Sequence, residues 1–139
     1  MTAEEYLGQW RGIDARIGRL LADLASLQAA AERMTTVLRH DRGSGARDPR
    51  AGENAAAALA DARTEIGAEV AGLIELKLEI SRTVDAVADP VLWRLLARRY
   101  LDGRDWFRVA DELGVSLASV HRLHRKALDA VRVPDGTRR

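Results

Sequence analysis

The side chains best suited to binding chemistry in this sequence are basic, and they gather in its last third. Arginine carries N–H donors in a planar fork, which matches phosphate oxygens and the edge of a guanine base. The residues placed to meet phosphates are Arg98, Arg99, Arg104, Arg108, Arg122, Arg125 and Lys126. A merely solvated helix face would mix the two signs of charge. The pattern therefore favours a surface that binds a polyanion.

The formal charge divides the chain in the same place. The whole sequence carries +1. Residues 90–139 hold eleven Lys and Arg against six Asp and Glu, a net of +5, whereas residues 1–89 hold eleven against fifteen, a net of −4. An acidic scaffold attached to a nucleic-acid-binding head has this asymmetry.

Residues 106–125 match the pattern of a helix-turn-helix. Ala110 falls where the two helices cross and only a small side chain fits, and Gly114 falls where the turn needs a left-handed backbone. Val120 packs the second helix onto the first, and Ser116 caps that second helix. The remaining core positions are Val109, Leu113, Val115 and Leu123. A plain helical hairpin with a glycine turn is the alternative, and the basic outer faces argue against it.

The second helix, residues 116–131, is predicted to enter the major groove of DNA as a recognition helix. Base reading is expected from its first turns, at Leu117, Ala118, His121 and Arg122, with Ser119 and Arg125 at the margins. Arg122 is the best candidate for a bidentate contact to guanine, and Ala118 or Leu117 could meet a thymine methyl group.

A long helix is predicted over residues 3–40, before this head. Thr2 and Glu5 have the spacing of a capping box. Apolar residues then follow at alternating spacings of four and three, the heptad pattern of a coiled coil: Tyr6, Trp10, Ile13, Ile17, Leu20, Leu24, Leu27, Ala31, Met34 and Leu38.

A flexible loop at 41–52 and a second long helix are predicted next. The apolar stripe of this helix consists of Leu59, Ile66, Val70, Leu73, Ile80, Val84 and Val87. Lys77 falls where the stripe would want an apolar side chain. The second helix can fold back on the first as an antiparallel hairpin, or the helices can pair between chains as a dimeric coiled coil. The sequence leaves both open, and the complete first seam favours a homodimer.

The head is predicted to begin at Asp89-Pro90, an N-cap followed by proline at the first helical position. A helix over Val91–Leu101 follows, and Asp105 caps the next one. The expected fold is therefore all-α: a long antiparallel helical hairpin or coiled coil, then a three-helix helix-turn-helix head. The expected domains are residues 1–88 for the coiled coil, 89–133 for the head and 134–139 for a disordered tail.

Several classes of function find no support. Cysteine is absent, which excludes disulfides and Cys-based zinc sites and suits a reducing cytoplasm. His121 and His124 are three apart, with His40 as a distant third, but no carboxylate completes a metal-binding set. No apolar run reaches the roughly 18–20 residues of a membrane span. We expect a cytoplasmic, non-enzymatic protein without cofactor or metal.

The head also resembles a known family. Asp89 to Leu92, Arg98 to Gly103, Val109 to Ser116, Val120-His121 and Lys126 to Leu128 are similar to the region-four domain of bacterial sigma factors, which binds the promoter −35 element. The chain also has an opening Tyr6-Leu7 segment, a polar loop in the middle, the stretch Leu76 to Ile80, and an ending with Arg-Tyr, Trp and Val-His. In these features the whole chain resembles small phage and prophage proteins of unassigned function. The resemblance implies a phage-encoded transcriptional regulator. Leu117 and Ala118 stand where sigma factors usually carry charged base-reading residues, and no promoter-melting region is visible.

The sequence is therefore compatible with two functions. The first is a regulator that binds double-stranded DNA, with the coiled coil setting dimer spacing or contacting another protein. The second is an interaction module, in which the coiled coil and the sigma-like head dock on RNA polymerase or another partner without sequence-specific DNA binding.

Overall fold

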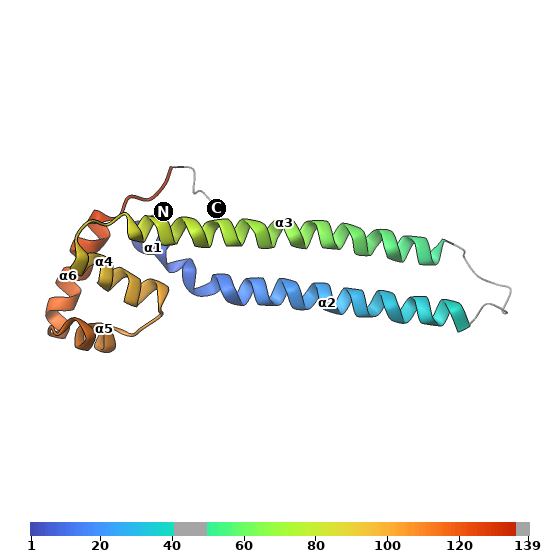
Figure 1. Ribbon diagram of the computed structural model, residues 1–139, viewed down its shortest axis with the longest axis horizontal. Helices are drawn as coiled ribbons and strands as arrows, with labels where there is room; N and C mark the ends of the chain where they lie inside the picture. The colour runs from blue at the N-terminus through green and yellow to red at the C-terminus, as the bar shows by residue number, and fades with distance from the viewer. Residues whose placement is uncertain (41–49, 136–139) are drawn as a thin grey trace. The chain divides into compact units, whose positions relative to one another are not determined.

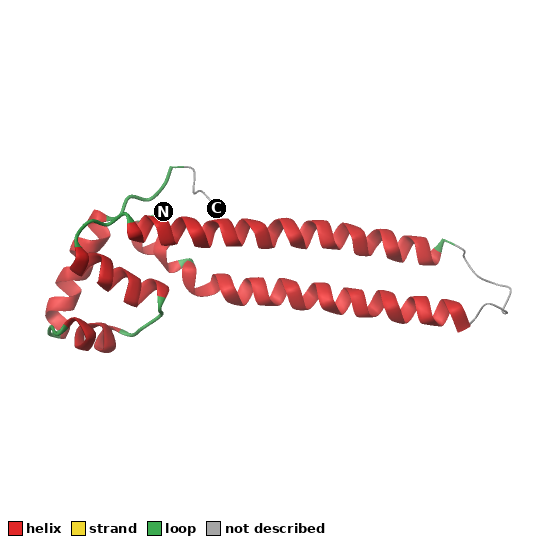
Figure 2. Ribbon diagram, viewed as in Figure 1, coloured by secondary structure: helices red, strands yellow, loops and turns green. Residues whose placement is uncertain are grey.

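The computed structural model describes residues 1–40 and 50–135, and this part of the chain is helical apart from short connections, with no strand (Figures 1 and 2). The all-α prediction is confirmed. In chain order the helices are α1 (Ala3–Gly8), α2 (Trp10–His40), α3 (Ala51–Asp85), α4 (Pro90–Leu96), a π-helical turn η1 (Ala97–Leu101), α5 (Trp106–Leu113) and α6 (Leu117–Ala130). The predicted loop at 41–52 lies mostly outside the described residues, but Ala51 and Gly52 already belong to α3. Of the predicted tail, residues 136–139 lie outside them.

The first long helix is interrupted, contrary to the prediction of one helix over residues 3–40. The capping box is confirmed: the Glu5 N–H donates to Thr2 Oγ1 (3.1 Å), and the Thr2 N–H donates to Glu5 Oε2 (3.0 Å). At Gln9 the helical pattern tightens, because the N–H of Gln9 donates to Tyr6 O and the N–H of Gly12 to Gln9 O, three residues back instead of four (3.3 Å each). The break therefore separates α1 from α2 at a point flanked by two glycines, which weaken a helix.

The described helices form two compact units. The first consists of residues 1–14 and 74–139, and the second of residues 15–73. The boundary near residue 88 that the sequence predicts lies inside the first unit.

The core of the first unit includes the N-terminal segment. Tyr6 and Leu7 are completely buried. The Tyr6 hydroxyl donates to Glu79 Oε2 (2.8 Å) and lies 3.2 Å from Thr83 Oγ1, and burial raises the pKa of Tyr6 to about 12. The other fully buried large side chains of this unit belong to Ile13, Ile80, Val84, Leu95, Leu96, Val109 and Val120.

Contacts of Trp10 and Asp14 explain why a lysine stands at position 77 of the apolar stripe. The indole N–H of Trp10 donates to Leu101 O (3.0 Å), a carbonyl at the end of the π-helical turn η1. The Lys77 ammonium lies 4.9 Å from the Trp10 ring centroid and pairs with Asp14 (2.7 Å). A lysine therefore suits this position in the stripe, because its stem covers an aromatic face while its charge meets a carboxylate.

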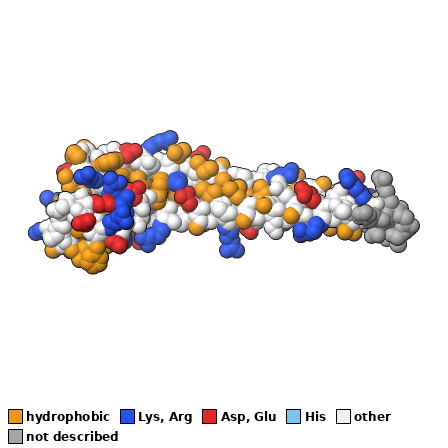
Figure 3. Space-filling view, turned by 60° about the horizontal axis from the view of Figure 1, so that its bottom comes forward, with side chains coloured by type: hydrophobic (Ala, Val, Ile, Leu, Met, Phe, Trp, Pro, Cys, Tyr) orange, Lys and Arg blue, Asp and Glu red, His pale blue; other side chains and the backbone are white. Residues whose placement is uncertain are grey.

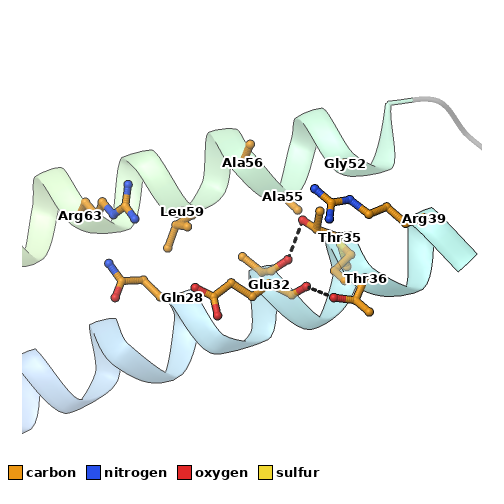
Figure 4. A pocket seen from close by; sticks show the side chains of 12 residues that line it. Gln28, Glu32, Thr35, Thr36, Arg39, Gly52, Ala55, Ala56, Leu59 and Arg63 are labelled. Carbon is orange, nitrogen blue, oxygen red and sulfur yellow. Dashed lines mark hydrogen bonds between the residues drawn. The ribbon is translucent and has the colours of Figure 1, made fainter.

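In the second unit the segments 15–40 of α2 and 51–73 of α3 run side by side (Figure 1). Burial in this unit is shallow: Leu27 and Met34 are 45% and 46% exposed, although both belong to the predicted heptad seam. A groove of about 400 Å³ between the segments is lined by Gln28, Glu32, Arg39 and Arg63 among others (Figure 4). Thr35 and Thr36 donate to the carbonyls of Ala31 and Glu32 within α2, as the dashed lines show (Figure 4).

Candidate nucleic-acid interface

Local residue chemistry accounts for α5, α6 and the turn between them. Asp105 caps α5 by accepting the Arg108 N–H (2.8 Å), and Ser116 caps α6 by accepting the Ser119 N–H (3.1 Å). Gly114 closes α5 in the left-handed conformation (φ 68°), which glycine adopts without steric cost. The Val115 N–H then donates to Ala110 O (3.0 Å). The caps and the glycine turn predicted from the sequence are confirmed.

The packing between α5 and α6 places their small and branched residues inside. Val109 and Val120 are completely buried, and Ala110 is 6% exposed. Ala127, two turns after Val120 on the same face of α6, is also buried. Helix α4 packs against α6 as well. Leu113, Val115 and Leu123 are half-buried. The predicted core positions Val109, Ala110 and Val120 are therefore buried, whereas the predicted core positions Leu113, Val115 and Leu123 stay partly in contact with solvent.

The outer face of α6 carries the predicted base-reading residues. Leu117, Ala118, His121 and Arg122 are exposed, as are Arg125 and Lys126. Ser119 is half-buried, and its hydroxyl accepts from the Ser116 hydroxyl and from Arg122 Nη2 (both 3.0 Å). The side chains of Arg125 and Lys126 make no hydrogen bond or ion pair within residues 1–40 and 50–135. Their donors are available to an external anion.

The arginines that precede α6 are arranged differently, because Glu112 draws them together. Arg104 pairs closely with Glu112 Oε1 and Arg108 Nε lies 3.4 Å from it, while Arg98 Nε lies 3.4 Å from Glu112 Oε2. Arg98 also pairs with Asp102 (2.9 Å). These three guanidinium groups are therefore partly neutralised inside the protein.

Figure 3 agrees with this arrangement, since basic and acidic side chains lie intermingled over the C-terminal helices. The sequence pattern predicts free arginines and gives no role to Glu112. Its spacing of four residues from Arg108 on one helix was a usable signal, because residues four apart on a helix are neighbours.

Arg99, Trp106 and the two histidines of α6 form an aromatic cluster. The Arg99 guanidinium lies 4.6 Å from the Trp106 ring centroid and donates to Arg104 O (3.0 Å). The Trp106 ring lies 4.4 Å from His124 and 5.4 Å from His121. Arg99 is therefore engaged as well, through its ring contact and its hydrogen bond.

His124 is buried, and its Nε2 lies 2.7 Å from the Tyr100 hydroxyl. Burial lowers the pKa of His124 and raises that of Tyr100 to about 12. Within the described chain no group of three His, Cys, Asp or Glu side chains could hold a metal ion, and the His40 side chain lies outside the described residues. His124 serves the core of this unit.

The lowered pKa of His124 has a consequence for stability. Its folded-state pKa lies below the ordinary value of 6.5, so the unfolded chain binds more protons in the interval between the two values. We expect the contribution of His124 to be complete above pH 6.5 and to be lost as pH falls through the folded-state pKa. Urea unfolding between pH 7.5 and pH 5 (roughly the window that an ordinary histidine pKa sets) measures it.

Two variants make the histidine measurement specific. His124→Gln should flatten the loss of unfolding free energy on acidification, whereas the exposed His121→Gln should retain the loss shown by the wild type. Equal pH dependence in all three proteins would show that burial does not lower the pKa of His124.

Comparisons of the chain with protein-family models, with curated proteins and with solved structures find no match. Among the described residues, no helix combines the length and apolar character needed to span a bilayer.

Proposed function

We propose that this protein is a DNA-binding transcriptional regulator, in which α5, the Gly114 turn and α6 act as a helix-turn-helix and α6 enters the major groove. The observation that carries the proposal is the pairing of a tightly packed α5–α6 crossing with an exposed outer face on α6. Val109, Ala110 and Val120 are buried at the crossing, while Leu117, Ala118 and Arg122 are exposed in the first turns beyond the cap. A recognition helix needs this division, because its inner face must be held rigidly while its N-terminal turns reach base edges.

Phosphate contacts are assigned chiefly to Arg122, Arg125 and Lys126. Arg98, Arg104 and Arg108 already contact Glu112, so they contribute less to binding than their number suggests. Arg99 is held on Trp106. Leu117 and Ala118 offer no side-chain hydrogen bonds to bases, so sequence preference rests on Arg122, His121 and contacts to thymine methyl groups.

From the resemblance of the head to sigma region four, and of the whole chain to small phage and prophage proteins, we propose that this activity takes place at phage or prophage promoters in the cytoplasm. RNA polymerase is a candidate partner. The side-by-side segments of α2 and α3 are proposed to act as a helical hairpin through which the chain forms a homodimer. A dimer would double the contacts with DNA and set the spacing between half-sites.

The test is binding to a pool of random duplexes at low salt, followed by fluorescence anisotropy. Arg122→Ala with Lys126→Ala should weaken binding at least about tenfold and reduce the slope of log affinity against log salt, since each lost phosphate contact removes about 0.9 from the slope. The control is Arg94→Ala with Arg132→Ala, which removes the same charge from exposed positions outside α6.

The proposal fails if the wild-type chain does not bind duplex DNA at low salt. It also fails if the α6 variant and the control lose the same affinity, because the interaction would then be a general effect of net charge.

The second candidate function is protein docking by the same head. Phe107, on α5, is 74% exposed, and a large apolar side chain left in water often marks a contact with a partner. Binding of the wild-type chain to purified RNA polymerase, together with no binding to DNA at low salt, would favour this function.

A further inference from the structure

Besides the groove with polar side chains described above, an apolar groove lies between α2 and α3 in the second unit. The charges of the two segments indicate what covers this apolar groove. We infer that this groove binds the same groove of a second copy of the chain, so that α2 of each copy packs beside α3 of the other. The inference rests on the homodimer proposed above. It specifies the surface through which the two copies bind and the helices that contact each other. It does not depend on DNA binding.

The lining of this groove is entirely apolar. It encloses about 190 Å³ and is formed by Leu27, Ala30, Ala31, Met34, Ala55, Ala58 and Leu59. Leu27 and Met34 leave almost half of their surface in water. Two helices alone cannot cover both apolar stripes, and amphipathic helices derive most of their stability from burying that face. Further helices of matching character are needed.

The charges of the two segments favour a second copy of this chain as the source of those helices. Between residues 15 and 40, α2 carries Arg16, Arg19, Arg33 and Arg39 against Asp23 and Glu32. Between residues 51 and 73, α3 carries Glu53, Asp61, Glu65 and Glu69 against Arg63. Among the described residues of these segments, no ion pair joins a charge of α2 to a charge of α3.

Each chain therefore has one basic segment, in α2, and one acidic segment, in α3, and the described residues of these two segments form no ion pair with each other. Packing α2 beside α3 of a second copy brings opposite charges together at both contacts, because a two-fold interface repeats each contact. Packing α2 on α2, or α3 on α3, would bring like charges together.

Four exposed residues are placed to form these contacts. Arg16 precedes Leu27 by eleven residues, and Glu65 and Glu69 follow Ala58 by seven and eleven, spacings that keep a residue on one side of a helix. Leu27 and Leu59 line the same groove, and the segments run in opposite directions, so Arg19 lies level with Glu69 along the helices. Asp23, four residues after Arg19 on α2, is an acidic residue close to these arginines.

Charge reversal and exchange test the pairing, with sedimentation velocity of the full chain as the readout. The wild type should be a dimer at tens of micromolar. Arg16→Glu with Arg19→Glu should raise the dimer dissociation constant at least about tenfold, and Glu65→Arg with Glu69→Arg should do the same, because each places like charges in contact. An equimolar mixture of the two variants, and one chain carrying all four substitutions, should restore the dimer.

The control is Glu53→Arg with Glu75→Arg, which applies the same change of charge at exposed positions on another side of α3 and should leave the dimer intact. Because the chain contains no cysteine, disulfide cross-linking gives a second measurement that does not alter these charges. A mixture of Leu27→Cys chains with Leu59→Cys chains should form the mixed disulfide dimer faster than either variant forms its own.

The outcomes distinguish a failure of the self-association from a failure of the α2-beside-α3 pairing. A wild-type monomer at these concentrations overturns both the self-association and this surface. A wild-type dimer that both reversals leave intact, or preferential cross-linking of Leu27→Cys chains to each other, overturns the α2-beside-α3 pairing while the self-association stands.

Discussion

Replacement of Tyr6 by alanine is expected to lower the free energy of unfolding of the first unit by about 3–5 kcal/mol, the range for deleting a fully buried aromatic ring. Tyr6 is completely buried, and its hydroxyl contacts Glu79 and Thr83 of α3, more than seventy residues away in the chain. The substitution removes the ring and deprives Glu79 and Thr83 of the hydroxyl that they contact. Urea unfolding, followed by tryptophan fluorescence, measures the loss.

Tyr6→Phe is the matched control, because it keeps the ring and removes only the hydroxyl. Its expected cost is about 1 kcal/mol, typical of one net hydrogen bond. If Tyr6→Ala cost no more than Tyr6→Phe, the N-terminal segment would not be part of this core, and the unit would be stabilised by the C-terminal helices alone.

Replacement of Glu112 by glutamine is expected to change stability and DNA affinity in opposite directions. The carboxylate holds Arg98, Arg104 and Arg108 together, and its Oε2 is buried. Its loss leaves Arg104 and Arg108 without their carboxylate partner, whereas Arg98 keeps its pair with Asp102. These side chains are partly exposed, which limits the expected loss of unfolding free energy to about 1–2 kcal/mol. Released from Glu112, the arginines can contact phosphates, so affinity for duplex DNA at low salt should rise several-fold.

Asp102→Asn provides the comparison for Glu112→Gln, since Asp102 pairs with Arg98 alone. It makes the same change of charge but should raise DNA affinity less, because it removes one carboxylate contact of Arg98 and leaves Arg104 and Arg108 paired with Glu112. Equal gains from the two variants would mean that net charge, and not the release of the arginine cluster, controls affinity. A lower affinity in Glu112→Gln would mean that Glu112 positions the arginines for DNA.

Features that depend on a few neighbouring residues were predictable from the sequence. Thr2 with Glu5, and Asp89, Asp105 and Ser116, cap helices because a short polar side chain satisfies the free N–H groups of the first turn wherever that turn forms. Gly114 closes α5 because glycine adopts a positive φ without strain. The burial of Ala110 and Val120 followed from helical periodicity in the same short stretch. Whether these helices read DNA stays a prediction.

Features that depend on partners far along the chain were decided only by the tertiary structure. The tightened turn at Gln9 and the π-helical turn at Ala97–Leu101 occur where Trp10 reaches the Leu101 carbonyl, a contact between segments ninety-one residues apart. The heptad pattern was uniform from Tyr6 to Met34, yet burial falls from complete at Tyr6 to about half at Met34. Periodicity specifies which face of a helix is apolar, whereas burial and ion pairing depend on the atoms that pack against that face.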